Sequence, residues 1–217
     1  MEWRSADGVE WLQARLSGAR AAFSTRSAGD VKESPERLAA ALGLNPDRIA
    51  TARQVHGADL LRDAGEPTGV DADGHVLTKP AGAALVKVAD CLPVALAGRG
   101  GAAILHCGWR PLAAGIVAKG VEAVGATEAA IGPGIGPCCY EVGDEVLAAF
   151  APLGEGIAAG RMLDLAEAAR RLLREAGVER VESAGLCTRC DERFFSHRRD
   201  GDPRRQAGAV WLEATEA

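Results

Sequence analysis

The chain has 217 residues, of which 47% are hydrophobic and 25% charged, and these fractions exclude a wholly disordered protein. Its formal net charge of −5 gives no general attraction for nucleic acid or acidic membranes, and no apolar run approaches the roughly 20 residues that span a bilayer. Aromatic residues supply only 4% of the chain, so we expect a core of Ala, Val, Leu and Ile with close backbone approaches. We expect a single domain over residues 1–217. We also expect it to be cytoplasmic, since the first residues form no signal peptide.

The predicted elements mix strands and helices, with no internal repeat and no long linker. In chain order they are a strand at 21–24, a helix at 34–42, strands at 49–55, 83–88, 92–97 and 102–106, helices at 112–124, 144–150 and 164–176, and strands at 178–184 and 207–212. Ser34 as N-cap and Pro35 at the first helical position mark the start of the first helix. The hairpin in the middle favours an α+β protein, or an α/β protein with a mixed sheet, over regular βαβ units.

A short glycine-rich turn joins two of these strands and brings two metal-ligand types together. If Ala97 and Ala102 flank the turn, the residue numbers of each antiparallel pair in the hairpin add up to about 199. Pro93 then lies opposite His106, and Cys91 lies just beyond the same end of the hairpin. A thiolate and an imidazole at one place form half of a zinc site.

A third residue completes the candidate metal site. His56 also ends a predicted strand and is the natural third ligand. One Cys and two His, with a fourth position open to water, are typical of a catalytic zinc site rather than a structural one. The same proximity would also suit Cys91 as a nucleophile with His106 as its base and no metal. The spacing does not separate these two interpretations.

Other Cys and His residues have simpler interpretations. The segment Cys187-Thr188-Arg189-Cys190 has the CxxC spacing of metal sites, but an adjacent pair such as Cys138-Cys139 seldom binds one ion. We therefore expect these cysteines, like Cys107, to be buried packing thiols near the pocket. His75 is expected in a surface turn.

Eight short motifs cover most of the chain, from about residue 20 to 212. They are FSTR from Phe23, QVHG from Gln54, ADCLPV from Ala89, HCGWR from His106, IGPGI from Ile131, YEVG from Tyr140, CT from Cys187 and FFSHR from Phe194. In this order they resemble the YfiH/laccase-domain family, also called the multicopper polyphenol oxidase-like or purine nucleoside phosphorylase family. One motif alone would be weak, but the ordered set is specific.

The resemblance implies a fold, a metal and a reaction. The fold is a layered mixed-sheet α/β fold similar to the cytotoxic necrotizing factor catalytic domain. Zinc is held by the residues that match His56, Cys91 and His106, with copper as the alternative metal. The activity is phosphorolysis of adenosine, inosine and methylthioadenosine to the base and a ribose 1-phosphate, with an accompanying adenosine deaminase activity. We accordingly predict Cys91, His106 and Asp90 as catalytic residues.

Phosphorolysis also requires cationic groups that bind phosphate. Arg26, Arg110 and Arg198 are the candidates, because guanidinium groups bind phosphate oxygens in pairs. Gln54 is a further candidate substrate contact, and Asp90 could orient a metal ligand or act as a general base.

Other functions remain as alternatives. One is an amidase-like hydrolase that uses Cys91 and His106 to edit the peptidoglycan precursor UDP-MurNAc-L-Ser. A polyphenol oxidase is weaker, because a site with several copper ions needs roughly ten His and Cys ligands and the chain has four His. The loop after Arg26 is shorter than in the family, and its shortening could remove activity. A non-catalytic binding protein is therefore another alternative. The expected partners are a purine nucleoside and phosphate, with no nucleic acid or membrane, and the chain is expected to be a monomer.

Overall fold

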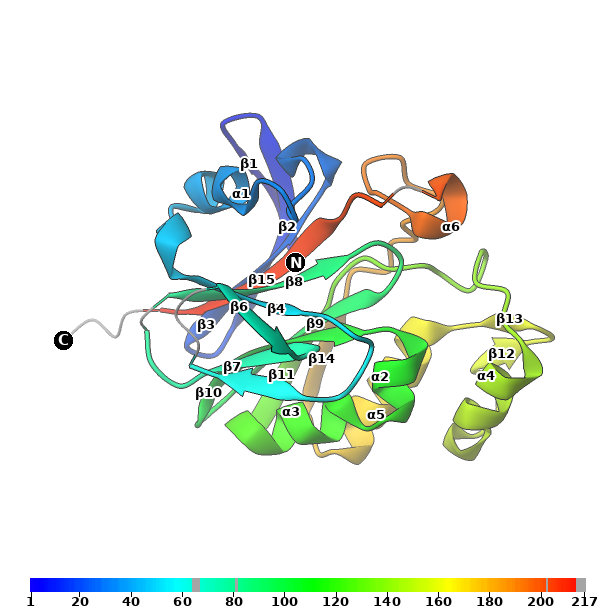
Figure 1. The fold of residues 1–217 in the computed structure, drawn as a ribbon. Helices are drawn as coiled ribbons and strands as arrows, with labels where there is room; N and C mark the ends of the chain where they lie inside the picture. The colour runs from blue at the N-terminus through cyan, green and yellow to red at the C-terminus, as the bar shows by residue number, and fades with distance from the viewer. Residues whose placement is uncertain (64–66, 81, 202, 214–217) are drawn as a thin grey trace.

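The computed structural model describes residues 1–63, 67–80, 82–201 and 203–213, and within them the strands form two large sheets (Figure 1). The seven-stranded sheet has the order β1 (Glu2–Ala6), β2 (Val9–Leu16), β3 (Ala19–Ser24), β15 (Gln206–Leu212), β8 (Ala83–Val88), β4 (Ile49–Arg53) and β6 (Pro67–Asp71). The six-stranded sheet has the order β14 (Arg180–Ser183), β11 (Ala126–Ile131), β9 (Leu92–Gly98), β10 (Gly101–Cys107), β7 (Gly74–Leu77) and β5 (Leu60–Arg62). β12 (Ala158–Ala159) and β13 (Met162–Leu163) pair separately.

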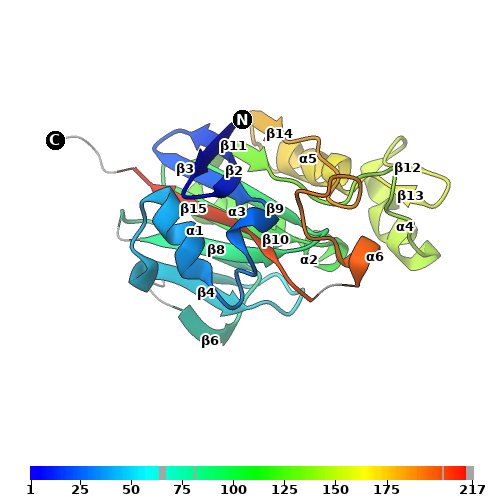
Figure 2. The same cartoon turned by 90° about the horizontal axis from the view of Figure 1, so that it is seen from above.

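Helices cover the outer faces of the two sheets (Figures 1 and 2). They are α1 (Pro35–Leu42), α2 (Trp109–Ala113), α3 (Ile116–Val124), α4 (Asp144–Phe150), α5 (Leu165–Glu175) and α6 (His197–Asp200), and short 3₁₀ turns lie at Arg26–Ala28, Pro46–Arg48 and Ala151–Leu153. β8 pairs parallel to β4 but antiparallel to β15. The expected mixed α+β fold is therefore confirmed. No helix in the described ranges is long and apolar enough to cross a membrane.

The core lies in three layers. Between the sheets, small side chains such as Ala84 and Ala95 pack in one buried cluster and let the two backbones approach closely. Beyond the seven-stranded sheet, Leu38 of α1 packs in a second cluster. Beyond the six-stranded sheet, Ile116 of α3 and Leu165 of α5 join a third. The aliphatic, alanine-rich core expected from the composition is what the structure contains.

The central hairpin has the predicted register. Ala102 pairs with Ala97 and His106 pairs with Pro93. The single helix predicted at 112–124 is wrong, because the chain forms α2 and α3 with a break at Gly115, whose φ of 82° is not helical. The sequence analysis also predicted no strands before residue 19 or between residues 60 and 77, where β1, β2, β5, β6 and β7 form.

The expectation of a surface position for His75 is also wrong. His75 lies within β7, which pairs with both β5 and β10, and its side chain is 2% exposed. Its Nδ1 atom has no hydrogen-bond partner among the described residues. Burial, and then the charge of Lys87, lower the pKa of His75 to about 4.

Acid should therefore weaken the fold through His75. A histidine whose pKa is lowered by folding makes its full contribution to the free energy of unfolding above its unfolded pKa of 6.5. This contribution is lost as the pH falls toward 4. We expect the loss to be about 3 kcal/mol of unfolding free energy between pH 7 and pH 4. Urea unfolding of wild type and His75→Gln, both with chelator present, would measure it. Parallel pH dependences in the two proteins would contradict the expectation.

Candidate metal centre and its cavity

Three strand ends bring His56, Cys91 and His106 together. His56 follows β4, Cys91 lies in the turn between β8 and β9, and His106 lies near the end of β10. Their ligand atoms all lie within 4.8 Å of one another. The Cys91 Sγ and His56 Nε2 atoms are 4.0 Å apart, and the two imidazole ring centroids are 4.8 Å apart. The three predicted metal ligands therefore lie close enough to share one ion.

The backbone around these ligands is constrained. His56 and Asp90, which precedes Cys91, both have positive φ angles, 58° and 82°, that non-glycine residues seldom adopt. A Cβ atom at Gly108 would come within 2.8 Å of Cys91 Sγ, so only glycine leaves room for the thiol at this position. Such strain persists where the surrounding contacts hold it, and it concentrates at functional sites.

Asp73 holds two of the three ligands, and the sequence analysis missed it. Its carboxylate is fully buried and accepts hydrogen bonds from the backbone N–H groups of Val55 (3.1 Å), His56 (3.0 Å) and Gly57 (2.7 Å). Its Oδ1 atom also lies 2.7 Å from His106 Nδ1. With Nδ1 engaged, Nε2 is the nitrogen of His106 that can bind a metal, which is the arrangement usual for metal-binding histidines.

Asp73 could not be recognised by its spacing from the ligands. It precedes β7, and the pairing of β7 with β10 brings it beside His106, whose N–H donates to the Asp73 carbonyl at 2.7 Å. The one local signal was a carboxylate directly before a glycine at a strand end.

Cys91 and His106 perturb each other's protonation. Burial raises the pKa of Cys91, but the charge and hydrogen bonds of His106, and then those of His56, outweigh it and lower the pKa to about 6. Burial lowers the pKa of His106, but Cys91 and Asp73 outweigh it and raise the pKa to about 9. Both shifts favour the thiolate form of Cys91, which is the form that binds metal ions or attacks a substrate.

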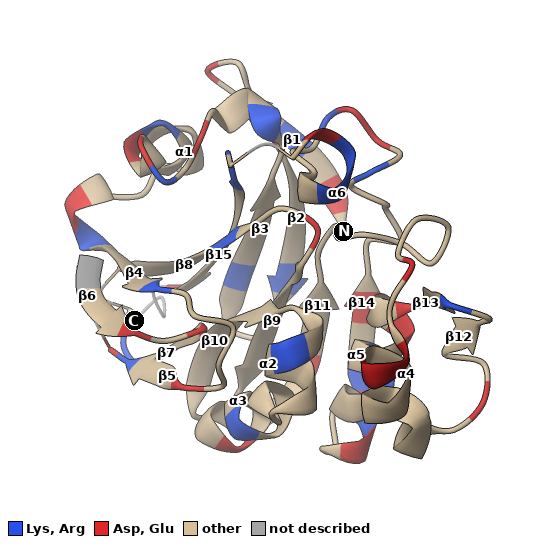
Figure 3. Cartoon of the chain, turned by 45° about the vertical axis from the view of Figure 1, so that its right-hand side comes forward, with Lys and Arg blue, Asp and Glu red and all other residues tan. Residues whose placement is uncertain are grey.

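The three ligands line a cavity of about 550 Å³ that is also lined by several cationic side chains. Its lining includes five cationic side chains, namely Lys32, Arg53, Lys87, Arg198 and Arg205. Elsewhere both signs of charge are mixed, as on α5 and α6 (Figure 3). Arg53 pairs with Asp71 and Lys32 with Asp30, and Asp90 lies in the same lining. Positive side chains still outnumber negative ones in the lining, so the cavity is suited to an anionic group although the whole chain is acidic.

Arg198, Gln54 and Asp90 line this cavity. The Gln54 amide is fixed by two 2.8 Å hydrogen bonds to the backbone of Lys87. The Asp90 carboxylate accepts hydrogen bonds from the Thr188 hydroxyl and from the backbone N–H of Arg198, both at 2.7 Å. Asp90 thus fastens the segment that carries Arg198 to the turn that carries Cys91.

Arg26 and Arg110 do not line the cavity. The Arg26 guanidinium donates to the Glu192 carbonyl and lies over the ring of Phe195, 5.2 Å from its centroid. The Arg110 guanidinium lies over the ring of Trp109 at 4.3 Å. The cations that sequence reasoning missed are Lys32, Arg53, Lys87 and Arg205, which come from four separate segments.

The other cysteines divide into two kinds. Cys107 is fully buried, as expected. The expectation of buried packing thiols is wrong for the remaining four, because Cys138 and Cys190 are exposed and Cys139 and Cys187 are half-buried.

The donor set fits a zinc ion. Two imidazoles and one thiolate are typical zinc ligands, and three protein ligands leave one coordination position open. Within the described residues, the structure groups His and Cys side chains in one set of three and one set of four. This is fewer than the roughly ten ligands that a site with several copper ions would need.

Comparison with known proteins identifies relatives over most of the chain. Residues 21–213 match the family model described as multi-copper polyphenol oxidoreductase laccase. The purine nucleoside phosphorylase YfiH of Escherichia coli is 36% identical over 197 residues, which cover 84% of this chain and 81% of that protein. A purine nucleoside phosphorylase of Streptomyces coelicolor is 36% identical, covering 97% and 93%.

Solved structures have the same fold. The Bacillus licheniformis protein YfiH superposes with a TM-score of 0.85 at 27% identity, covering 97% of this chain and 99% of that chain. YlmD from Geobacillus stearothermophilus superposes with a TM-score of 0.83 at 29% identity, covering 98% and 99%.

Proposed function

The chain belongs to the multi-copper polyphenol oxidoreductase laccase family, whose members include the YfiH proteins, and from this premise we propose that it is a zinc-dependent purine nucleoside phosphorylase. The relatives named purine nucleoside phosphorylase, 36–39% identical, support the reaction class. The observation that carries the proposal is that one cavity is lined by both the three-ligand set and five cations. Phosphorolysis needs a binding place for phosphate beside the nucleoside, and a cation-lined cavity supplies it.

Each side of the cavity has a separate task in this reaction. An oxygen of hydrogen phosphate attacks the anomeric carbon of the sugar, and the bond from that carbon to the base breaks. The base leaves with the proton that the phosphate gives up. In this proposal Arg198, whose guanidinium lines the cavity and also donates to the Glu141 carbonyl, binds the phosphate, and Lys87 and Arg205 add positive charge along the lining. Bound zinc would supply Lewis-acid polarisation at its open position. Asp73 keeps the His106 ring in place throughout.

Tyr140 lines the same cavity, and its phenol stays protonated at neutral pH. Burial, and then the nearby Cys91, raise the pKa of Tyr140 to about 12. Arg198 lies over its ring, 5.3 Å from the centroid. A neutral phenol can donate a hydrogen bond to the sugar or the base, so we propose Tyr140 as a substrate contact together with Gln54.

Adenosine deamination is proposed as a side activity of the same site. It requires attack by water at C6 of adenine, and a zinc site with an open position is the kind that activates water. Conversion of adenosine to inosine without phosphate, lost together with phosphorolysis on chelation, would support it. Deamination that survives chelation would argue against a shared site.

One observation favours a second function. Cys91, His106 and Asp73 are arranged like a nucleophile, its base and the carboxylate that orients the base. This arrangement would suit a metal-independent amidase acting on UDP-MurNAc-L-Ser. Release of L-serine by metal-free enzyme that is inactive toward inosine would favour the amidase. Phosphate-dependent release of hypoxanthine from inosine, abolished by chelation, would favour the phosphorylase.

Replacing Arg198 tests the phosphate site. We expect Arg198→Gln to raise the KM for phosphate about tenfold to a hundredfold, because a hydrogen bond to a charged group is worth about 1.5–3 kcal/mol. Steady-state kinetics at saturating inosine would measure it. Arg99→Gln is the matched control, since Arg99 is exposed in the turn at the far end of the hairpin from His106. An unchanged KM for phosphate in Arg198→Gln would contradict this role.

A further inference from the structure

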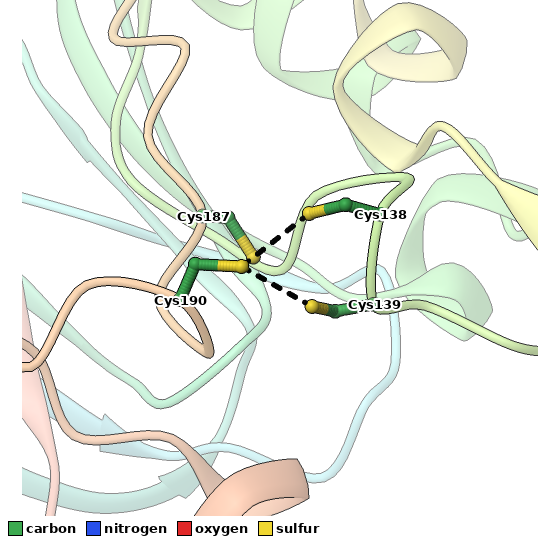
Figure 4. A group of neighbouring side chains, drawn as sticks. All are labelled: Cys138, Cys139, Cys187 and Cys190. Carbon is green, nitrogen blue, oxygen red and sulfur yellow. Dashed lines mark hydrogen bonds between the residues drawn. The ribbon is translucent and has the colours of Figure 1, made fainter.

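A second cluster of four cysteines lies outside the centre described above (Figure 4). Cys138 and Cys139 lie in the turn after the Gly- and Pro-rich loop at 132–137, and Cys187 and Cys190 lie in a turn after β14. Their four Sγ atoms all lie within 4.8 Å of one another. The Sγ atom of Cys190 is 3.3 Å from that of Cys139 and 3.6 Å from that of Cys138. Thiols about fifty residues apart in sequence thus converge on one point.

The spacing of the sulfurs fits a single tetrahedral ion. Zinc–sulfur bonds of about 2.3 Å place the four thiolates of a tetrahedral site about 3.8 Å apart. The two short Sγ–Sγ separations, 3.3 and 3.6 Å, are slightly below this value, and all four sulfurs lie within 4.8 Å of one another. An iron–sulfur cluster divides its four thiolates among two or four irons and so needs the sulfurs further apart than a single ion does. All six cysteines are free, so no disulfide occupies any of the four.

Hydrogen-bond donors lie beside two of the four sulfurs. The Gly136 N–H donates to Cys187 Sγ at 3.2 Å, and the Arg189 guanidinium hydrogen-bonds the Cys139 sulfur. Donors of this kind orient and stabilise metal-bound ligands. The turn also explains how two adjacent cysteines can face one point. The N–H groups of Cys139 and Tyr140 both donate to the Gly136 carbonyl, at 2.9 and 3.1 Å, and this closes the chain tightly around the pair.

We propose that Cys138, Cys139, Cys187 and Cys190 form a structural zinc site, separate from the His56, Cys91 and His106 centre. Four thiolates close the coordination sphere and leave no position for a substrate. The ion crosslinks two segments that build the walls of the cavity.

The crosslink would act on the cavity through both segments. The segment at 132–143 carries Ile135 and Tyr140, which line the cavity. The other segment carries Thr188, which bonds to Asp90, and continues to Arg198. Two backbone hydrogen bonds also join the segments, from the Thr188 N–H to the Gly134 carbonyl at 2.9 Å and from the Gly134 N–H to the Leu186 carbonyl at 3.3 Å. A metal at this point would fix the positions of these two cavity walls relative to each other.

Metal analysis of matched variants tests the proposal. Under reducing conditions with zinc supplied, we expect about two zinc ions per chain in the wild type. Cys138→Ser/Cys190→Ser and Cys91→Ala should each hold about one, and the combination of all three substitutions none. Cys107→Ala, which removes a buried thiol outside both groups, should keep the wild-type content. Circular dichroism would establish that each variant is folded.

Cobalt replacement in Cys91→Ala isolates the four-cysteine site without altering it. We expect strong thiolate-to-cobalt absorption and visible bands of tetrahedral cobalt, both lost on adding Cys138→Ser. The melting temperature of Cys91→Ala should also rise when zinc is added. Folded Cys91→Ala that binds no zinc or cobalt would overturn the proposal, and so would thiol titration that finds a disulfide among the four cysteines in the protein purified with reductant.

Discussion

Replacing Cys91 by alanine is expected to remove the metal at the His56, Cys91 and His106 centre and to lower phosphorolysis by at least about a thousandfold. Two imidazoles without the thiolate make a weak site, and the Lewis acid contributes several kcal/mol to the reaction, each 1.4 kcal/mol being a factor of about ten in rate. Elemental analysis and inosine turnover would be measured on the same preparation. Loss of activity should follow loss of one metal ion per chain.

The matched control is Cys107→Ala. Cys107 is the next cysteine along the chain, at the end of β10, and is fully buried, but it is not one of the three ligands. This variant should keep both its metal and its turnover. Wild-type turnover in Cys91→Ala, with no metal bound at this centre, would show that Cys91 is neither a ligand nor a nucleophile.

The second large effect is expected at Asp73. Asp73→Asn keeps the side-chain shape but loses the charge and one acceptor oxygen, so buried N–H groups of the 55–57 segment lose their partner. We expect the zinc affinity to fall about tenfold to a hundredfold, and the free energy of unfolding to fall by about 2–4 kcal/mol. Competition with a chelating dye and urea unfolding would measure the two effects.

Asp59→Asn is the comparison for Asp73→Asn. The Asp59 side chain is 83% exposed and pairs with Lys119 on the surface, so its loss should change stability by less than about 1 kcal/mol. If Asp73→Asn binds zinc as tightly as Asp59→Asn, then Asp73 does not position the metal ligands.

The sequence specifies the local part of the site well. The turn between β9 and β10 determines which residues face each other, so the placement of Cys91 near His106 followed from counting along the chain. The boundaries of α1 were equally local, because Pro35 starts the helix and Gly43 ends it with a left-handed conformation. His56 was predicted as the third ligand because it ends another predicted strand.

The parts that the sequence could not specify depend on contacts between distant segments. Asp73 reaches His106 only through the pairing of β7 with β10, and the same pairing buries His75. The four cysteines converge because the loop at 132–137 lies beside the segment after β14, as the bridge between Gly134 and Cys187 shows. No local pattern encodes such neighbours, so spacing alone favoured packing thiols over a metal site.

The most direct test of the account is whether the zinc-loaded protein cleaves inosine with phosphate. Inosine would be incubated with and without phosphate, while hypoxanthine is followed by absorbance and the sugar product by phosphorus NMR. We predict that hypoxanthine release requires phosphate and that ribose 1-phosphate appears in equal amount. Release of hypoxanthine with free ribose, at a rate independent of phosphate, would contradict the account, as would no release by the zinc-loaded protein.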